Sequence, residues 1–151
     1  MTVSIRNARP SDIQAIADLE ASLYGAEGYG NYAIRQFIDM FPDSFFISQG
    51  EATLTGYALV GVKAASKMAW ILSICVEKAS QGQGIGRALI GRCIAYCTKN
   101  GFEVCALTVA PDNSSAVHLY ESLGFSVTER VRDYYRAGDS RLVMTRTWPN
   151  S

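Results

Sequence analysis

Apolar and polar residues alternate along short segments of the chain, and this pattern predicts β-strands. Residues 3–9 show the alternation, which places successive side chains on opposite faces of a strand. Short segments bounded by turn residues predict six more strands, at residues 44–48, 52–63, 68–76, 103–109, 125–134 and 141–147. The chain therefore has enough strands for a sheet with a buried face.

Other segments carry apolar residues at helical spacing instead. In the first of them, apolar side chains recur at positions 13, 16, 17 and 23, and Ser11 with Gln14 has the form of a capping box at the helix start. Three more helices are predicted over about residues 32–40, 84–99 and 113–123, and a glycine follows each of the last two as a helix-ending residue. The element order is β-α-α-β-β-β-α-β-α-β-β.

This order predicts an α/β (α+β) fold. The strands between residues 44 and 76 are joined by connections too short for crossovers, so they form an antiparallel meander. The strand–helix–strand unit of residues 68–109 requires a right-handed crossover to a parallel neighbour. We therefore expect one domain over residues 1–151, built on a mixed, mostly antiparallel twisted sheet of about seven strands with helices on both faces.

Composition and charge narrow the function. The chain has 151 residues, with 14 lysine and arginine residues against 14 aspartate and glutamate residues, so its formal net charge is zero. A protein that coats nucleic acid needs a basic surplus, so no nucleic-acid partner is expected. The N-terminal residues lack the apolar stretch of a signal peptide, and no apolar run reaches membrane-spanning length. We expect a soluble, cytoplasmic protein without a membrane partner.

The four cysteines, Cys75, Cys93, Cys97 and Cys105, each lie in an apolar segment. No C-x-x-C pair occurs, and the single histidine, His118, is distant from them in sequence, so no metal site is expected. Free cysteine in apolar surroundings behaves as a small hydrophobic residue. We therefore expect four buried, reduced thiols.

A glycine-rich turn follows the strand at residues 68–76 and leads into the next helix. Glycines at positions 82, 84 and 86 let backbone N–H groups converge, and the helix start adds free donors and the positive end of the helix dipole. Such a turn is suited to a diphosphate. The sequence has neither G-x-x-x-x-G-K-[ST] nor G-x-G-x-x-G, and reads Q-x-x-G-x-G from Gln81 to Gly86. Taken alone, this pattern fits a tight connection between strand and helix equally well.

A second motif decides between these alternatives. Residues 113–125 read N-x-x-A-x-x-L-Y-x-x-L-G-F, which resembles the second half of the GNAT superfamily of acyl-coenzyme A N-acyltransferases. The stretch from Gln81 to Gly86 is similar to the coenzyme A signature of that superfamily, in the expected order and separation, and the element order fits its fold. The tail, residues 132–144 with Tyr134 and Tyr135, resembles the paired-tyrosine ending of the RimI-type N-terminal alanine acetyltransferases of ribosomal proteins.

The resemblance implies an enzyme that uses acetyl-coenzyme A, and a role for each matching residue. Tyr120 is the implied general acid, which contacts the cofactor and protonates the departing thiolate, a role that a phenol is able to fill near neutral pH. By itself, Tyr120 also fits the apolar face of its helix. The other implied coenzyme A contacts come from the glycine-rich turn, the edge of the strand before it and the second motif: Gln81, Gly82, Gln83, Gly84, Ile85, Gly86, Arg87, Ile74, Cys75, Val76 and Asn113.

One position departs from the RimI type. Where those enzymes carry a glutamate that helps to deprotonate the amine, this chain has Thr108, which cannot act as a base. Glu27 is a candidate substitute, although a solvated loop carboxylate explains it as well. An α-amine has a reference pKa near ~8, so on the order of a tenth is neutral at pH 7, whereas a lysine at ~10.4 is almost wholly charged. The missing base therefore favours an α-amine or another weakly basic amine over a lysine side chain as the acceptor.

Two tyrosine clusters in separate loops are candidate walls of an acceptor site. They are Tyr29 and Tyr32, beside Glu27, and Tyr134 and Tyr135; ordinary half-buried packing is the alternative for them. Three functions are compatible with these residues: acetylation of a protein N-terminus, acetylation of a small amine such as an amino sugar, polyamine or antibiotic, and sensing of coenzyme A without catalysis. The phenol of the second motif counts against the sensor. The protein is expected to be a monomer or homodimer.

Overall fold

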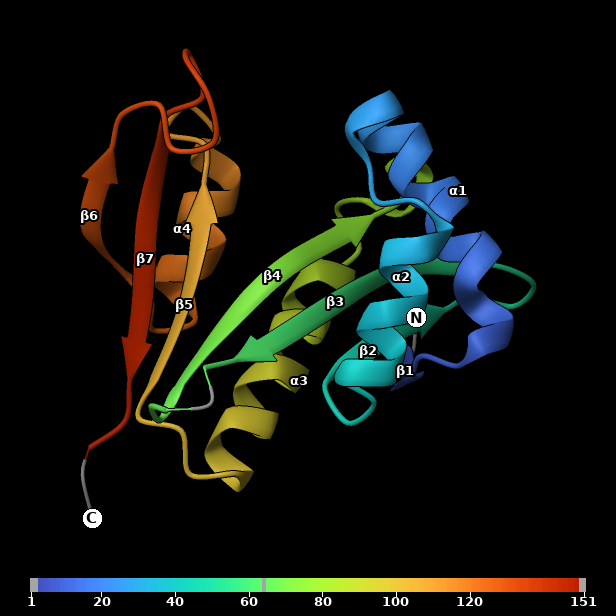
Figure 1. The fold of residues 1–151 in the computed structure, drawn as a ribbon, viewed down its shortest axis with the longest axis horizontal. Coiled ribbons are helices and arrows are strands. Elements are labelled where there is room, and N and C mark those ends of the chain that lie inside the picture. Colours follow the sequence, from blue (N-terminus) through green and yellow to red (C-terminus); the bar gives the residue numbers. More distant parts are fainter. Residues whose placement is uncertain (1–2, 64, 150–151) are drawn as a thin grey trace. The chain divides into compact units, whose positions relative to one another are not determined.

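The structure is a computed structural model that describes residues 3–63 and 65–149 (Figure 1). The described residues form strands β1 (Ser4–Asn7), β2 (Phe45–Gln49), β3 (Leu54–Val62), β4 (Met68–Val76), β5 (Val104–Val109), β6 (Ser126–Val131) and β7 (Arg141–Thr147). They also form helices α1 (Ile13–Tyr24), α2 (Asn31–Met40), α3 (Ile85–Lys99) and α4 (Ser114–Ser122), with short 3-10 helices η1 (Pro10–Asp12), η2 (Gly25–Glu27) and η3 (Lys78–Ser80). The predicted order of strands and α-helices is confirmed.

The strands form one seven-stranded sheet in the order β1-β2-β3-β4-β5-β7-β6. Four neighbouring pairs, β1 with β2, β2 with β3, β5 with β7 and β6 with β7, are antiparallel, and β4 with β5 is parallel. The parallel pair is joined through α3, as the strand–helix–strand unit requires. The predicted mixed, mostly antiparallel sheet is therefore confirmed.

Two compact units make up the described chain. The first comprises the residues up to Gly61 together with Leu72–Tyr96, and the second comprises Val62–Ile71 together with the residues from Cys97 onward. β4 therefore contributes its first residues to the second unit and its last residues to the first. That residues 1–151 act as one domain stays a prediction.

The first unit has helices on both faces of its strands. On one face, α1 and α2 pack on an apolar cluster that includes Phe45 and Ile47 of β2. Phe46 points to the other face, because successive strand residues alternate. There it meets α3: the Arg92 guanidinium lies 5.4 Å from its ring centroid, and the Tyr96 ring centroid lies 6.4 Å away. For this unit, the expected placement of helices on both faces holds.

Gly56 of β3 sets how closely β4 and α3 approach. A Cβ added at Gly56 would lie 2.6 Å from the carbonyl oxygen of Cys75 and 3.2 Å from Leu89 Cδ1. Real side chains do not come so near to a backbone oxygen, so only glycine fits there. The last part of β4 and the start of α3 are therefore held against the same point of β3.

In the second unit, α4 is attached to β7. The Arg146 guanidinium donates to the carbonyl oxygen of Leu123 at 2.7 Å. Gly124 then has a φ of 93°, a left-handed conformation that favours glycine and ends the helix as predicted. Tyr120 of α4 packs edge to face on Phe125, with ring centroids 6.3 Å apart.

The predicted capping box at Ser11 and Gln14 is wrong. The Gln14 side chain donates to an aspartate in the next turn, and the cap forms at η1 instead, where the Asp12 carboxylate accepts the Arg9 N–H at 2.7 Å. The same carboxylate binds the Arg6 guanidinium of β1 through two hydrogen bonds of 2.8 Å. A carboxylate prevails here because it accepts such a two-pronged, charge-assisted pair and a serine hydroxyl does not.

β6 is shorter than predicted. It ends at Val131 rather than at residue 134. Asp133 then adopts a φ of 53°, which breaks the extended strand, and the Tyr134 N–H donates to the Asp139 carbonyl at 2.9 Å. Tyr134 and Tyr135 therefore lie in the turn between β6 and β7.

All four cysteines are buried, as predicted. Within residues 3–63 and 65–149, no helix is both long and apolar enough to cross a membrane. Among the same residues, no group of three or more His, Cys, Asp or Glu side chains is placed to hold a metal ion.

The Asp12 carboxylate makes stability depend on pH. Its hydrogen bonds from Arg6, and then that from the Arg9 backbone, hold the pKa of Asp12 below its ordinary value of 3.8. A carboxyl whose folded pKa is lowered stabilises the fold above its unfolded pKa, and this contribution is lost as the pH falls through the folded pKa. We expect Asp12→Asn to lower the free energy of unfolding by about 1–3 kcal/mol at pH 7, with the difference from wild type shrinking below about pH 4.

Urea unfolding at a series of pH values measures this difference. Asp18→Asn is the matched control, because Asp18 lies exposed on α1, the helix that directly follows Asp12. A loss for Asp12→Asn that is the same at pH 7 and below the folded pKa would contradict the role of the charged carboxylate.

Candidate functional site

The glycine-rich turn between β4 and α3 has the open backbone that the sequence predicts. Gly82 and Gly84 have φ values of 80° and 84°, in the left-handed region that favours glycine. A Cβ added at either residue would meet nothing within 4 Å. The backbone conformation, not crowding by the protein, therefore requires these glycines, and the outer side of the turn is left free for a ligand.

The start of α3 presents backbone donors beside this turn. The helix begins with the Ala88 N–H bonding the Gly84 carbonyl at 3.0 Å, so the N–H groups of Ile85 and Gly86 precede the first helical bond. The positive end of the helix dipole lies at the same place, and the exposed Arg87 adds a cation. This arrangement suits a phosphate or diphosphate.

The turn is tied back to the end of β4. Gln81, predicted as a cofactor contact, donates from its side-chain amide to the carbonyl oxygen of Val76 at 3.1 Å. Ser80, which is buried, donates to the Glu77 carboxylate at 2.5 Å, and the Glu77 N–H donates to the carbonyl of Thr55 at 2.9 Å. Glu77 and Ser80 were not predicted. They hold the turn to β3, while Gln81 joins it to the strand edge predicted for pantetheine.

The predicted strand edge, Ile74 to Val76, lies beside an irregularity in β4. Ser73 bonds the Tyr57 hydroxyl at 2.8 Å, on the face covered by α1 and α2. Leu72 lies on that face too, because its Cδ1 would be 2.8 Å from a Cβ added at Gly61. Two consecutive side chains on one face indicate a β-bulge, which leaves backbone groups of the strand available for other partners.

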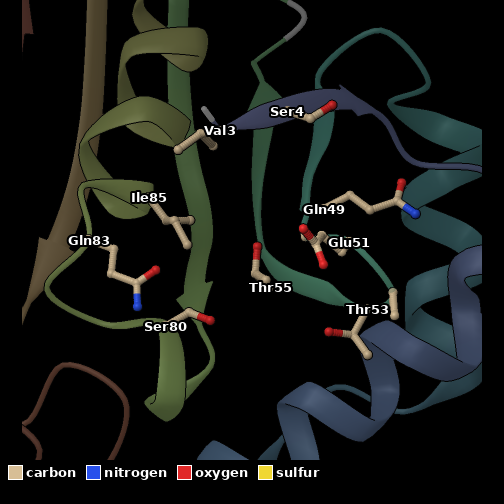
Figure 2. Close-up of a pocket in the computed structure, with 11 residues that line it drawn as sticks. Val3, Ser4, Gln49, Glu51, Thr53, Thr55, Ser80, Gln83 and Ile85 are labelled. Atoms are coloured by element: carbon tan, nitrogen blue, oxygen red, sulfur yellow. The ribbon is translucent and has the colours of Figure 1, made fainter. Parts of the chain in front are cut away.

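A hollow of about 760 Å³ lies on the inner side of the turn (Figure 2). Gln83 and Ile85 form one wall, and Gln49, Glu51 and Thr55 lie opposite. Glu51 is the one charged side chain among its lining residues. A diphosphate would be repelled by this carboxylate, so the outer face of the turn is the better phosphate site.

The sequence analysis missed a buried carboxylate on α1. Glu20 is 2% exposed, and its Oε1 accepts the hydroxyl of Tyr57 and the thiol of Cys75, the latter at 3.5 Å. Its Oε2 accepts the backbone N–H of Tyr29 at 3.2 Å. The available signal was its place on the apolar stripe of α1, four residues after the buried Ile16.

Burial controls the protonation of the groups around Glu20. It raises the pKa of the Cys75 thiol to about 11, with the Glu20 charge as the second cause. It also raises the pKa of the Tyr57 phenol above its ordinary value. Both groups therefore keep their protons at neutral pH, and Cys75 is not a nucleophile.

In the second unit, the two residues predicted from the second motif lie on α4. Tyr120 is buried at the end of the helix. Asn113 caps the start, where its side-chain oxygen accepts the Ala116 N–H at 3.3 Å and the Ser115 hydroxyl at 3.2 Å. The oxygen of Asn113 is thus used by the helix, and its amide N–H groups remain for a ligand.

The structure gathers some of the predicted acceptor residues. The rings of Tyr134 and Tyr135 pack edge to face with centroids 4.8 Å apart, and the Tyr135 hydroxyl lies 3.3 Å from Thr108 Oγ1. The Arg141 guanidinium lies 5.3 Å from the Tyr135 ring centroid. Thr108 therefore supports the tyrosine pair.

The other predicted acceptor residues belong to the first unit. Tyr29 packs edge to face on Phe37 at 5.1 Å, whereas Tyr32 is 91% exposed. Glu27 is exposed in η2, and its role stays a prediction. The loop thus carries a packed tyrosine, and the first turn of α2 carries a projecting one.

Comparison with known proteins finds acetyltransferases. The profile of the Acetyltransferase (GNAT) family matches residues 13–125. Over 121 residues, the chain is 35% identical to the ribosomal protein bS18-alanine N-acetyltransferase of Escherichia coli K12, which covers 73% of this chain and 82% of that protein.

Solved structures share the fold. Ard1 from Thermoplasma volcanium has a TM-score of 0.88 at 23% identity, covering 99% of this chain and 100% of that one. The yncA protein of Salmonella typhimurium, solved with its cofactor acetyl-CoA, has a TM-score of 0.80 at 23% identity, covering 100% of this chain and 96% of that one. At these identities the likeness concerns the fold.

Binding of coenzyme A by the glycine-rich turn is tested by a substitution at Gly84. We expect Gly84→Ala to weaken coenzyme A binding about tenfold. A left-handed conformation costs a residue with a Cβ roughly 1–2 kcal/mol, so the free turn of the variant leaves it and binding has to restore it, and ~1.4 kcal/mol is a factor of ten. Isothermal titration with coenzyme A measures the affinity. Gly91→Ala, on α3 where an added Cβ also meets nothing within 4 Å, is the control and should bind normally. Equal affinity of both folded variants would show that the turn does not hold the cofactor.

Proposed function

Because this chain belongs to the Acetyltransferase (GNAT) family, we propose that it transfers an acetyl group from acetyl-coenzyme A to the α-amine of a protein N-terminus. That it is an N-acetyltransferase follows from the family and its named relatives. The N-terminal acceptor is the proposal. The observation that carries it is the 35% identity to an N-acetyltransferase that acts on the alanine of a ribosomal protein.

Thr108, at the position where RimI-type enzymes carry a glutamate base, supports a weakly basic acceptor. Thr108 holds the Tyr135 hydroxyl at 3.3 Å and supplies no carboxylate. An α-amine, with a reference pKa near ~8, needs less help to lose its proton than a lysine at ~10.4. An N-terminal α-amine therefore fits these side chains better than a lysine side chain does.

The donor site is proposed at the glycine-rich turn. The outer face of Gly82 and Gly84 and the N–H groups of Ile85 and Gly86 fit a diphosphate, with Arg87 as a neighbouring cation. Bound acetyl-coenzyme A supplies the thioester carbonyl that the amine attacks. The strand edge from Ile74 to Val76 is proposed to hold the pantetheine arm through its backbone groups.

Tyr120 is proposed as the acid of the reaction, with Asn113 as a further contact of the cofactor. The amine attacks the carbonyl directly, the C–S bond breaks, and the phenol gives its proton to the sulfur. The proton that the attacking nitrogen loses restores the phenol. Support for this role comes from the N-x-x-A-x-x-L-Y motif. The edge-to-face contact with Phe125 holds the Tyr120 ring in one orientation.

A small amine is the second candidate acceptor. It is favoured by Tyr32 at the start of α2, whose side chain is 91% exposed and therefore forms no defined wall for a peptide. An aminoglycoside or a polyamine would be the corresponding substrate class.

The acceptor is tested by mass spectrometry after incubation with acetyl-coenzyme A. We expect acetylation of a peptide that begins with alanine and contains one lysine, at its N-terminus only. The control peptide has the same sequence with a formylated N-terminus and should stay unmodified. Acetylation of spermidine or an aminoglycoside in place of the peptide would contradict the proposed acceptor.

The acid is tested by Tyr120→Phe, which keeps the ring and its contact with Phe125. We expect turnover to fall by roughly 10²–10⁴-fold with little change in coenzyme A affinity, since general acid catalysis has that magnitude. Tyr96→Phe, which removes a phenol from α3, is the control and should keep its turnover. Near-full turnover in Tyr120→Phe would show that solvent protonates the thiolate.

A further inference from the structure

Glu20 is a buried carboxylate that accepts three hydrogen bonds. They come from the Tyr57 hydroxyl, the Cys75 thiol and the Tyr29 backbone N–H. Among the described residues, no lysine, arginine or histidine forms an ion pair with it. A buried charge without a counter-ion is unusual, because desolvation disfavours it. Such a group is a candidate for function rather than for stability alone.

The hydrogen bonds around Glu20 have a fixed direction. The Tyr57 hydroxyl has one proton, and it is donated to Glu20. In the 2.8 Å contact between Tyr57 and Ser73, Ser73 must therefore be the donor. The two hydroxyls form a chain in which each proton points toward the carboxylate.

The outer end of this chain is accessible. Ser73 is partly exposed, and once its proton is directed at Tyr57, its oxygen is left as an acceptor for an incoming N–H. Ser73 also stands next to Ile74, the first residue of the strand edge proposed for the pantetheine arm. The chain of hydroxyls thus runs from the part of β4 proposed for the pantetheine arm, through Tyr57 of β3, to the interior beside α1.

We propose that Glu20 takes up the proton of the acceptor ammonium through Ser73 and Tyr57, and so supplies the base that Thr108 does not. This inference rests on the proposed transfer of acetyl to an amine. The ammonium N–H bond breaks and its electron pair stays on nitrogen. Ser73 receives that proton and passes its own to Tyr57, whose proton passes to Glu20, which becomes a neutral carboxylic acid.

The neutral amine then completes the transfer. Its electron pair forms the N–C bond, and the electron pair of the C–S bond leaves with sulfur. The second proton that the nitrogen then gives up balances the proton that the thiolate receives. Ser73 and Tyr57 regain their starting forms within the relay, and Glu20 returns its proton to solvent in the reverse direction. The protons move together along the two hydrogen bonds, so neither hydroxyl becomes an anion.

Every titratable group that faces Glu20 is compatible with this role. Tyr57 comes from β3, Cys75 from β4, and Tyr24, whose hydroxyl lies 3.8 Å from the Cys75 sulfur, from α1 itself. The Cys75 thiol stays protonated at neutral pH, so it competes neither as a base nor as a nucleophile. Glu20 alone in this cluster accepts a proton and holds it.

Glu20 also anchors the loop before α2 through Tyr29, so the test must separate the relay from this anchor. Tyr57→Phe and Ser73→Ala cut the relay and leave the Tyr29 bond in place, whereas Glu20→Gln removes the proton acceptor. Ser44→Ala is the control: Ser44 is buried in the same unit and donates to the Val60 carbonyl at 2.7 Å, outside the site.

The readout is the pH profile of kcat/KM with two peptides that differ at one residue. One begins with alanine and the other with trifluoroalanine, whose fluorines make the amine weakly basic and neutral across the assay range. Without a base, only the neutral fraction of an alanyl amine reacts, about a tenth at pH 7. We expect each relay variant to lose about tenfold at pH 7 with the alanyl peptide, and to recover as the pH passes about 8.

With the trifluoroalanyl peptide, the same variants should match wild type at every pH. Ser44→Ala should match wild type with both peptides. Equal losses with both peptides, or a loss that does not change with pH, would show that the cluster is structural and overturn the relay. If Glu20→Gln does not fold, the other two relay variants decide the question.

A separate outcome would contradict the proposed N-terminal acceptor without contradicting the relay. If wild type acetylates neither peptide, an N-terminal acceptor is wrong, and the comparison is made with glycinamide and with aminoacetonitrile, whose nitrile makes its amine weakly basic. The relay then predicts the same loss for glycinamide and none for aminoacetonitrile. A wild-type enzyme that acetylates none of the four amines contradicts both proposals.

Discussion

The first unit is organised around the need to satisfy one buried carboxylate. Glu20 of α1 receives its three hydrogen bonds from β3, from β4 and from the loop before α2. A charged group taken out of water must keep its partners, so these segments have to converge. The backbone follows the same constraint: a Cβ at Gly28 would lie 2.8 Å from the carbonyl oxygen of Glu20. The loop before α2 therefore packs directly against α1 at Glu20.

The last part of β4 connects this cluster to the proposed donor site. Ser73 and Cys75 face the carboxylate, and the carbonyl of Val76 receives the Gln81 side chain from the glycine-rich turn. A stretch of four residues thus contacts both the proton-accepting cluster and the turn that would bind the diphosphate. Gly56 supports this stretch from β3, where no side chain fits. The proposed relay and the proposed donor site thus share one short piece of strand.

The second unit contributes a different set of contacts. Its Thr108 hydroxyl bonds Tyr135, and Arg141 stacks on that ring, so the turn between β6 and β7 is built from an aromatic pair and a cation. These groups provide packing surface and hydrogen bonds but no base.

Local features of this protein were determined by the sequence itself. The bounds of β4 and β7, the glycine-rich turn and the end of α4 at Gly124 follow from alternation, helix signals and left-handed glycines, which neighbouring residues define. The roles of Asp12 and Glu20 did not follow from local pattern. Asp12 prevailed as the cap because Arg6 lies across from it on β1, and Glu20 meets partners 37 and 55 residues away in Tyr57 and Cys75. The role of a carboxylate on an apolar helix stripe cannot be inferred until its hydrogen-bond donors are known. Those donors reach Glu20 only when β3 and β4 pair beneath α1.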